Sequence, residues 1–357
     1  MDLNGRPNNR HRRSHRPSRC RWPALPPSNL SQLIKVSPKI TKTLKHNEAI
    51  IITGGNCGLG FEAAKDLAGR VGNGKIILAC RNYDNGESAA SMIRQSSGNS
   101  NVICMKLDLA SSDSIRQFAL DLIKGNEDSN EQLDIYALIC NAGVWMPMEH
   151  NQKTDEGYEM HFGVNHLGHF RLIQSILPIM ATSKLDDNRI IFVSSSLLKS
   201  GKIDMQKRDF IHDGRSNEVD TNEKKRKSFA PTGYCDSKLM NALTCRQLAV
   251  ELQRKEQQQQ TNTITTYAVC PGFCKSNLGR SVQIPIYVRG IMRLFQRTSA
   301  QGAQNIVHAT MEDKEKLISG ALYQDGSIED GTTSFLDGVG ENVQKQLWDL
   351  STELTKK

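Results

Sequence analysis

Short and continuously apolar runs recur along the chain from residue 48 onward. The first is Ala49-Ile50-Ile51-Ile52-Thr53, and a run of this kind is typical of a strand that is buried on both faces. We expect further strands at 75–80, 102–107, 134–140, 189–194, 263–269 and 321–324. The intervening sequence predicts helices at 61–68, 85–95, 112–124, 156–180, 234–253, 299–311 and 342–354.

This alternation of strands and helices predicts an α/β fold. A parallel sheet covered by helices on both faces, with right-handed crossovers, is a doubly wound, Rossmann-type domain. We assign a single such domain to residues 48–325, with a polar insert at 199–233 that we expect to form a surface loop. Residues 326–357 are expected to form a C-terminal extension that ends in a helix.

The excess of positive charge belongs to the N-terminal segment. The 357 residues include 46 Lys and Arg against 38 Asp and Glu, but residues 1–47 hold 11 of the basic residues and one acid. Residues 48–357 are slightly acidic overall, so a folded domain that binds nucleic acid is disfavoured. Residues 1–47 have no apolar periodicity and no secretory-signal core, so we expect a disordered basic tail. An organelle-targeting peptide is the alternative.

The sequence does not indicate a membrane-spanning, a disulfide-stabilised or a metal-binding protein. No stretch approaches about 18 consecutive apolar residues, so we expect no spanning helix. The nine cysteines are odd in number, form no CxxC pair and often lie inside apolar runs, as Cys80 does, which predicts free thiols and no metal site. We expect an intracellular, reducing compartment, with the cytoplasm favoured. A mitochondrial location and a peripheral membrane contact stay open, as does oligomerisation.

A glycine-rich turn follows the first strand. In Thr53-Gly54-Gly55-Asn56-Cys57-Gly58-Leu59-Gly60 the glycines allow a tight turn and a close approach of backbone N–H groups to a pyrophosphate. The spacing is Gly-x-x-x-Gly-x-Gly rather than GxGxxG. The turn is therefore a candidate dinucleotide site formed by Gly54, Asn56, Gly58, Leu59 and Gly60.

The residue after the second strand predicts which dinucleotide binds. An acid here would hold the ribose 2′-hydroxyl of NAD, but the chain has Arg81, whose planar guanidinium can pair with a 2′-phosphate. NADP (as NADPH) is therefore expected and NAD is disfavoured. An ordinary surface arginine is the alternative interpretation.

A tyrosine and a lysine are placed for acid–base chemistry. Tyr234 and Lys238 are four residues apart, on one face of a predicted helix. A nearby positive charge favours phenolate, so Lys238 is expected to lower the pKa of Tyr234 from its usual value of about 10. Such a pair is common on helix surfaces, and it gains weight only beside the other motifs.

Together these motifs resemble the short-chain dehydrogenase/reductase family. The glycine turn, Asn141-Ala142-Gly143, the serines 194–196, Tyr234-x-x-x-Lys238 and Pro271-Gly272 occur in that family's order over residues 48–325. The segment Asn165-His166-Leu167-Gly168-His169-Phe170 is similar to the branch that includes the retinol dehydrogenases and the WW-domain oxidoreductase. Two departures are the longer spacing between Ser195 and Tyr234, caused by the insert, and Cys140 where an Asn is often found.

The resemblance implies a role for each matching residue. Tyr234 would be the general acid/base, Lys238 would bind the nicotinamide ribose, Ser195 would hydrogen-bond the substrate oxygen, and Asn165 would support a water relay. Cofactor contacts are implied for Asp108 (to adenine), Asn141, Ala142, Gly143, Pro271, Gly272 and Ser276.

Each of these residues has a plainer interpretation. Asn165 could only cap or bend its helix, Asp108 could be a turn residue, Ser276 could be loop surface, and Ser194 and Ser196 compete with Ser195. We interpret His166 and His169 as packing or surface residues. The sequence thus predicts an NADP-dependent oxidoreductase that acts on a carbonyl or alcohol of an apolar retinoid-, steroid- or lipid-aldehyde-like substrate. The alternatives are a low-turnover NADP-binding regulatory or scaffold protein, and a C=C reductase similar to protochlorophyllide reductase.

Overall fold

The computed structural model of the chain describes residues 34–37, 40–124, 133–146, 152–212, 231–259, 263–274 and 296–356. The expected tail up to residue 33, Ser276 and much of the 199–233 insert lie outside these residues. In chain order the elements are β1 Glu48–Thr53, α1 Gly58–Ala68, β2 Lys75–Cys80, α2 Tyr83–Ser97, β3 Val102–Lys106, α3 Ser112–Lys124, β4 Asp134–Cys140, η3 His161–Gly168, α4 His169–Ala181, β5 Asn188–Val193, η4 Ser196–Ser200, η5 Asp209–Ile211, α5 Thr232–Gln259, β6 Ile264–Val269, α7 Ser299–Met311, η7 Lys314–Lys316, β7 Leu322–Gln324, β8 Ser327–Ile328, α8 Asp330–Val339 and α9 Glu341–Thr355.

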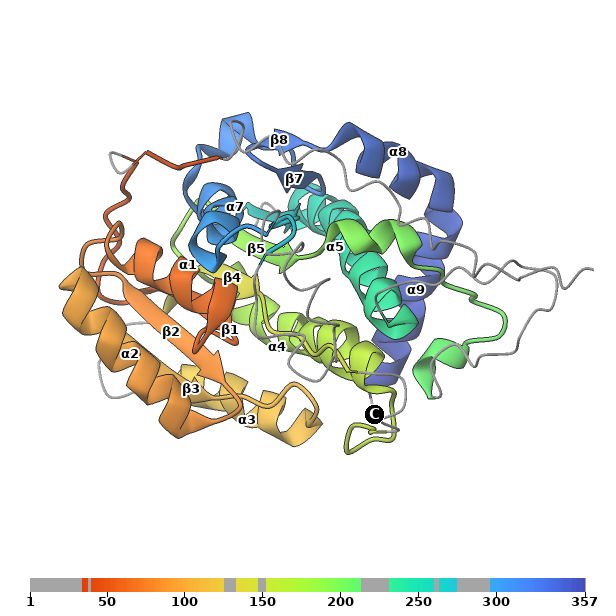
Figure 1. Ribbon diagram of the computed structural model, residues 1–357, viewed down its shortest axis with the longest axis horizontal. Helices are drawn as coiled ribbons and strands as arrows, with labels where there is room; N and C mark the ends of the chain where they lie inside the picture. The colour runs from red at the N-terminus through yellow and green to blue at the C-terminus, as the bar shows by residue number, and fades with distance from the viewer. Residues whose placement is uncertain are drawn as a thin grey trace, which may run out of the picture. The chain divides into compact units, whose positions relative to one another are not determined.

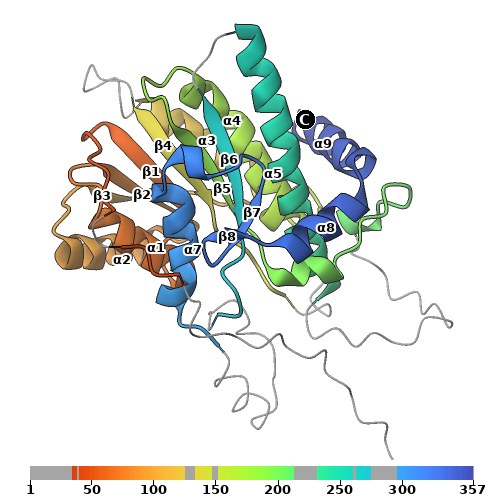
Figure 2. The same ribbon diagram turned by 90° about the horizontal axis from the view of Figure 1, so that it is seen from above.

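One sheet organises these elements, in the strand order β3-β2-β1-β4-β5-β6-β7-β8 (Figure 1). All pairings from β3 to β7 are parallel, and only β8 runs antiparallel to its neighbour. Helices α1, α2 and α7 cover one face and α3, α4 and α5 cover the other (Figure 2). The doubly wound, Rossmann-type prediction is therefore confirmed. Because β1 pairs with both β2 and β4, the chain reverses its winding between β1 and β4, which opens a crevice at their carboxyl ends.

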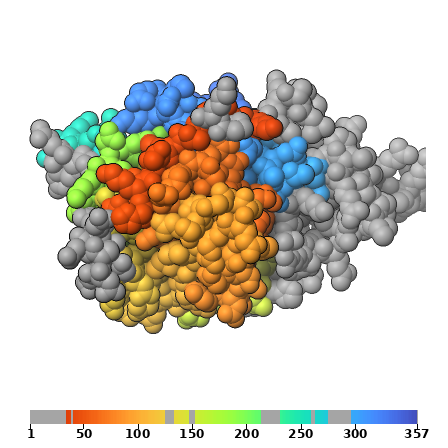
Figure 3. All heavy atoms as spheres, turned by 90° about the vertical axis from the view of Figure 1, so that its left-hand side faces the viewer, coloured from red at the N-terminus to blue at the C-terminus, as the bar shows by residue number. Residues whose placement is uncertain are grey.

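The first described residues pack against the fold, although the sequence assigned them to the tail. The N–H of Val36 donates to Gln304 Oε1 of α7 at 3.0 Å. Leu44 is buried, and its N–H donates to the carbonyl of Val71 at 3.1 Å. The Arg70 guanidinium, just after α1, donates to the carbonyls of Ser37, Ile40 and Val36 at 2.6, 3.0 and 3.2 Å. Figure 3 shows these red residues against the orange surface that follows them in the chain. The packed part of the chain thus starts before residue 48.

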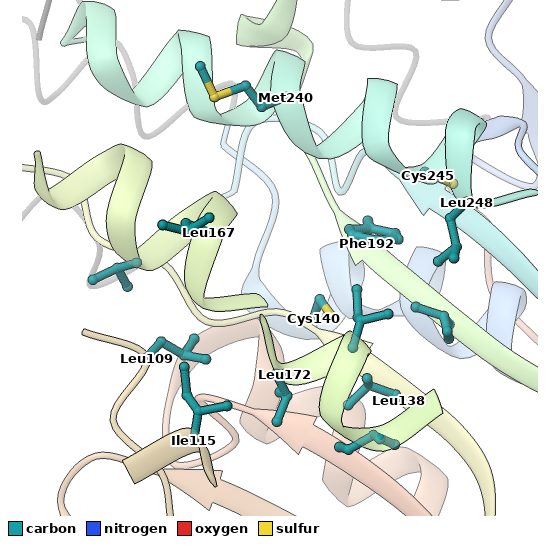
Figure 4. Packing of buried hydrophobic residues seen from close by; sticks show 14 of the residues in the cluster. Leu109, Ile115, Leu138, Cys140, Leu167, Leu172, Phe192, Met240, Cys245 and Leu248 are labelled. Carbon is teal, nitrogen blue, oxygen red and sulfur yellow. The ribbon is translucent and has the colours of Figure 1, made fainter. Parts of the chain in front are cut away.

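Two hydrophobic cores lie on either side of the sheet. Along β1, Ala49 and Ile51 belong to one core and Ile50 and Ile52 to the other, which is why the run has no polar alternation. Figure 4 shows the α4/α5 side, where strand residues meet helix residues, among them Leu138, Cys140, Phe192, Leu172, Cys245 and Leu248.

Two sequence expectations need correction. The predicted helix 156–180 starts only at His161, and its first eight residues form a π-helix. The 199–233 insert is not only surface loop, since Phe210 and Ile211 are buried in the core of the α4/α5 side. The C-terminal helix α9 joins the same core through Leu347, Leu350 and Leu354. Within the described ranges, no helix is both long and apolar enough to cross a bilayer.

A buried ion pair lies at the start of β5. Both carboxylate oxygens of Asp187 accept from Arg189, at 2.8 and 2.7 Å, and one also accepts from Lys42 at 2.8 Å. Burial alone would raise the pKa of Asp187, but the hydrogen bonds and charges of Arg189 and Lys42 hold it below its usual value. The Arg189 side chain is almost completely buried.

We expect Asp187→Ala to lower the free energy of unfolding by about 3–5 kcal/mol, because the Arg189 guanidinium stays buried without its carboxylate. Urea denaturation at pH 7 measures this. Since the folded-state pKa of Asp187 is depressed, the difference from the parent should shrink as pH falls below about 4. The exposed neighbour variant Asp186→Ala should stay within about 0.5 kcal/mol of the parent. Equal midpoints for the two variants would contradict the role of Asp187.

Candidate active site

The glycine turn lies at the carboxyl end of β1 and opens α1. Gly54 and Gly58 have φ of +65° and +60°, which favours glycine. A Cβ on Gly60 would lie 2.5 Å from Asn141 Nδ2 and 2.6 Å from the Gly54 carbonyl, so the backbones approach too closely for any side chain. Cys57 precedes α1 without capping it, and the first turn holds no acid, so this helix end suits an external anion.

The Cys80 thiol lies beside this turn, a position that the sequence did not reveal. Burial raises the pKa of Cys80 to about 12, against the smaller opposing effect of the backbone N–H groups of Gly55 and Asn56. Its position inside an apolar run indicated only a small buried side chain.

The Asn141–Gly143 turn after β4 is joined to β1 through Thr53. The Thr53 Oγ1 accepts from the N–H groups of Asn141 and Ala142, both at 2.9 Å, and Asn141 Nδ2 donates to the Thr53 carbonyl at 2.8 Å. The imidazole of His169 lies on the same hydroxyl, with Nε2 at 2.9 Å from Oγ1.

His169 extends this contact to Asn165. Its Nδ1 lies 3.0 Å from the Asn165 carbonyl, which can only accept, so Nδ1 carries the proton and Nε2 accepts from Thr53. Burial lowers the pKa of His169 to about 4. His166 is also buried, with its Nε2 at 2.8 Å from Ser351 Oγ of α9, and burial lowers its pKa to about 3. Both histidines are packing residues.

The structure brings Ser195, Tyr234 and Lys238 together where β5 meets the start of α5. The Ser195 hydroxyl lies beside Tyr234 and lowers the pKa of its phenol. Lys238 Nζ lies 5.6 Å from the centre of the Tyr234 ring and donates to the Val193 carbonyl at 2.8 Å. Of the other two serines, Ser194 Oγ donates to the Lys238 carbonyl at 2.9 Å, and Ser196 is exposed.

Burial dominates the protonation of this pair. It raises the pKa of Tyr234, against the opposing effect of the Ser195 hydroxyl, and it lowers the pKa of Lys238 to about 8. The expected lowering of the Tyr234 pKa by Lys238 is therefore wrong. The reason is that Tyr234 is only 6% exposed, so the cost of burying phenolate exceeds the attraction of Lys238, whose Nζ lies 5.6 Å from the centre of the ring.

Asn165 is in the π-helix, and its side chain holds a neighbouring loop. Its Oδ1 accepts from the N–H of Val144 at 2.7 Å, while Nδ2 donates to the Val144 carbonyl at 3.1 Å and to Ser237 Oγ at 3.0 Å. The amide thus ties the chain after Gly143 to α5. The water relay implied by the resemblance stays a prediction.

Pro271 and Gly272 follow β6 and are braced by an arginine that the sequence did not single out. Gly272 has φ +76°, and a Cβ there would lie 2.8 Å from the Arg297 guanidinium carbon. Arg297 pairs through two hydrogen bonds with Asp325, at 2.6 and 2.7 Å. An Arg and an Asp 28 residues apart gave no sequence signal.

The remaining candidates, Arg81 and Asp108, follow the carboxyl ends of β2 and β3. Arg81 is exposed after β2, and Lys106 donates to its carbonyl. Asp108 Oδ1 accepts from the N–H of Ala110 at 3.0 Å, so this carboxylate has a role in its own turn, and a contact with adenine stays a prediction. Across the parts of the chain that the structure describes, no three His, Cys, Asp or Glu side chains gather as metal ligands would.

Comparisons with known proteins identify the family of this chain. The profile of the short chain dehydrogenase family matches residues 48–206. Retinol dehydrogenase 11 of Mus musculus is 34% identical over 336 residues, which cover 90% of this chain and 94% of that protein. Human retinol dehydrogenase 12 is 35% identical over 308 residues, which cover 86% of each chain. This chain is a short-chain dehydrogenase/reductase of the retinol dehydrogenase-like branch.

Solved structures show the same fold for this dehydrogenase/reductase. A short chain dehydrogenase from Salmonella enterica has a TM-score of 0.56 at 19% identity, covering 82% of this chain and 100% of its own. One from Shigella flexneri has the same score and identity, covering 84% and 98%. Family members bind a nicotinamide cofactor and act on alcohol or carbonyl groups. The glycine cradle and the uncapped end of α1 fit the pyrophosphate of such a cofactor.

We expect Gly60→Ala to weaken nicotinamide dinucleotide binding by at least about tenfold, because relief of the clash with Asn141 and Gly54 must shift the turn. Titration of cofactor fluorescence measures this. Gly69→Ala is the matched control, since its Cβ would find only ordinary contacts of 3.6 Å or more at the other end of α1. If Gly60→Ala binds as tightly as Gly69→Ala, the turn is not the pyrophosphate site.

Proposed function

We propose that the protein is an NADP-dependent oxidoreductase that interconverts a carbonyl and an alcohol on an apolar substrate, with Tyr234 moving the proton. The observation that carries this is the placement of the buried Tyr234 beside Ser195, whose hydroxyl lowers the pKa of the phenol, with Lys238 one helical turn away. The retinol dehydrogenase names of relatives that match along most of the chain support an apolar substrate such as a retinoid, steroid or lipid aldehyde.

The nicotinamide and the residues around it would each have a separate role in the reaction. The nicotinamide supplies or accepts the hydride. Ser195 would hold the substrate oxygen, and Tyr234 would donate a proton to it in reduction or remove one in oxidation. Because burial raises the Tyr234 pKa, the phenol is protonated at neutral pH, which is the form that the reduction requires. With a pKa of about 8, Lys238 is mostly charged at pH 7 and favours the phenolate that donation leaves.

Arg81 supports NADP over NAD. It is exposed directly after β2, where its guanidinium can reach a 2′-phosphate, and Lys106 lies beside it through a bond to its carbonyl. An intracellular, reducing compartment is consistent with the eight described cysteines, all of which are free thiols.

Tyr234→Phe should lower kcat about 10²- to 10⁴-fold while leaving NADPH affinity nearly unchanged, because it removes only the transferable proton. The assay follows NADPH oxidation over a panel of apolar aldehydes and ketones, with product identification. Tyr267→Phe, at a buried tyrosine that packs on Tyr323, is the matched control. Equal turnover by Tyr234→Phe and the parent would defeat the role of Tyr234. Saturation of a C=C bond would favour the C=C reductase alternative.

Arg81→Asp should raise the Kd for NADPH about 10- to 100-fold and leave that for NADH unchanged or lower, because the charge-assisted hydrogen bonds to the 2′-phosphate are lost. Arg116→Asp, at another exposed arginine, controls for the change in net charge. A parent protein without preference between the two cofactors, or an Arg81 variant that keeps the preference, overturns the assignment.

A further inference from the structure

A half-buried carboxylate and a buried imidazole lie next to Tyr234, outside the set of residues discussed so far. Glu159 precedes the π-helix and His161 begins it. His161 Nδ1 lies 2.6 Å from Glu159 Oε1, and the second oxygen of Glu159 accepts from the N–H of Phe162 at 2.9 Å. Burial alone would raise the pKa of Glu159, but these hydrogen bonds hold it below its usual value, so the group is a carboxylate.

The proton of His161 can be placed. The N–H of Met146 donates to Nε2 at 3.1 Å, so Nε2 is unprotonated and Nδ1–H donates to Glu159. Both ring nitrogens are then occupied inside the protein. His161 is therefore not poised to exchange a proton with a substrate, and its contacts must serve another purpose.

The pair touches the start of α5 directly. The His161 ring meets the Tyr234 ring edge-on, with centroids 6.4 Å apart and planes at 80°. A Cβ on Gly233, the residue before Tyr234, would lie 2.9 Å from His161 Nδ1 and 3.3 Å from a Glu159 oxygen. The backbone that carries the phenol thus rests against the imidazole and the carboxylate.

The same imidazole also holds a second aromatic ring against the phenol. Asn165 binds the backbone of Val144, and His161 binds that of Met146, so the π-helix holds both neighbours of Trp145. Between these two points the Trp145 ring packs on Tyr234, with centroids 4.6 Å apart and planes at 38°.

We propose that Glu159 and His161 are positioning residues for Tyr234, holding the phenol and the Trp145 ring as one unit so that the hydroxyl stays on Ser195. The effect on catalysis rests on the function proposed above, whereas the effect on ring packing does not. Nothing in the chemistry requires the pair to touch the substrate, so its loss changes the rate and leaves cofactor affinity in place.

The test compares three variants by near-ultraviolet circular dichroism and by kinetics, with NADPH and an aldehyde that the parent reduces. His161→Phe keeps the ring but loses both hydrogen bonds. His161→Gln retains an acceptor for Met146 and a donor for Glu159. His212→Phe, at an exposed histidine stacked on Tyr158, is the control. The chain has three tryptophans, so the difference between Trp145→Leu and the parent defines the Trp145 band.

For His161→Phe we expect loss of about half or more of the Trp145 band and a kcat about 10- to 100-fold lower, with KM for NADPH within about twofold. His161→Gln should recover most of both signals, and His212→Phe should match the parent. An unchanged band in His161→Phe overturns the proposal, whatever the rate. A lost band with unchanged kcat overturns the link to catalysis.

Two further results distinguish a failure of this proposal from a folding defect and from a failure of the proposed function. If His161→Phe does not fold, Gly233→Ala decides, because its Cβ would displace the same imidazole; a normal band and rate in that variant overturn the proposal. If the parent reduces no carbonyl at all, the proposed function fails. The band in His161→Phe then still decides the positioning role alone.

Discussion

The site depends on how the hydroxyl of Thr53 joins the two central strands. Thr53 lies at the end of β1, where the glycine turn begins. Its hydroxyl oxygen accepts hydrogen bonds from the N–H groups of Asn141 and Ala142, just after β4. The Thr53 hydroxyl donates a hydrogen bond to His169 Nε2, and His169 Nδ1 donates to the Asn165 carbonyl. One buried oxygen thus holds the glycine turn, the Asn141–Gly143 turn and the π-helix relative to each other. Loss of any of these hydrogen bonds is unfavourable, because each buried polar group left unpaired would cost about 1–3 kcal/mol of stability.

Burial has more influence on the chemistry than net charge does. It acts on Tyr234 and Lys238 in opposite directions, since it disfavours phenolate in one and ammonium in the other. Burial therefore favours the uncharged form of both side chains, although Lys238, with a pKa of about 8, is still mostly charged at pH 7. The sequence showed a charge one turn away from a phenol, but it could not show how dry their surroundings are.

The sequence predicted the parts of the structure that local pattern controls. The apolar run at Ile50–Ile52 predicted its strand because both faces of the sheet are covered, and the Gly54–Gly60 turn was recognisable from its place after that strand. The π-helix was not predictable, because its widened turn is held by distant partners such as Val144 and Ser237. For the same reason the Arg297–Asp325 brace and the contacts of His161 were missed: they join residues whose proximity only the folded chain creates.

The contacts of residues 36–37 and 40–44 set a practical limit on where the protein can be cut. The family profile begins at residue 48, yet the Arg70 guanidinium at the end of α1 takes three of its acceptors from Ser37, Ile40 and Val36. A version trimmed to the profile would leave Asp66 as the remaining described partner of a cation that is 8% exposed. Helix α1 would lose these contacts at its C-terminal end, so shortening the chain to the family boundaries would disturb the helix that begins at the glycine turn, the candidate dinucleotide site.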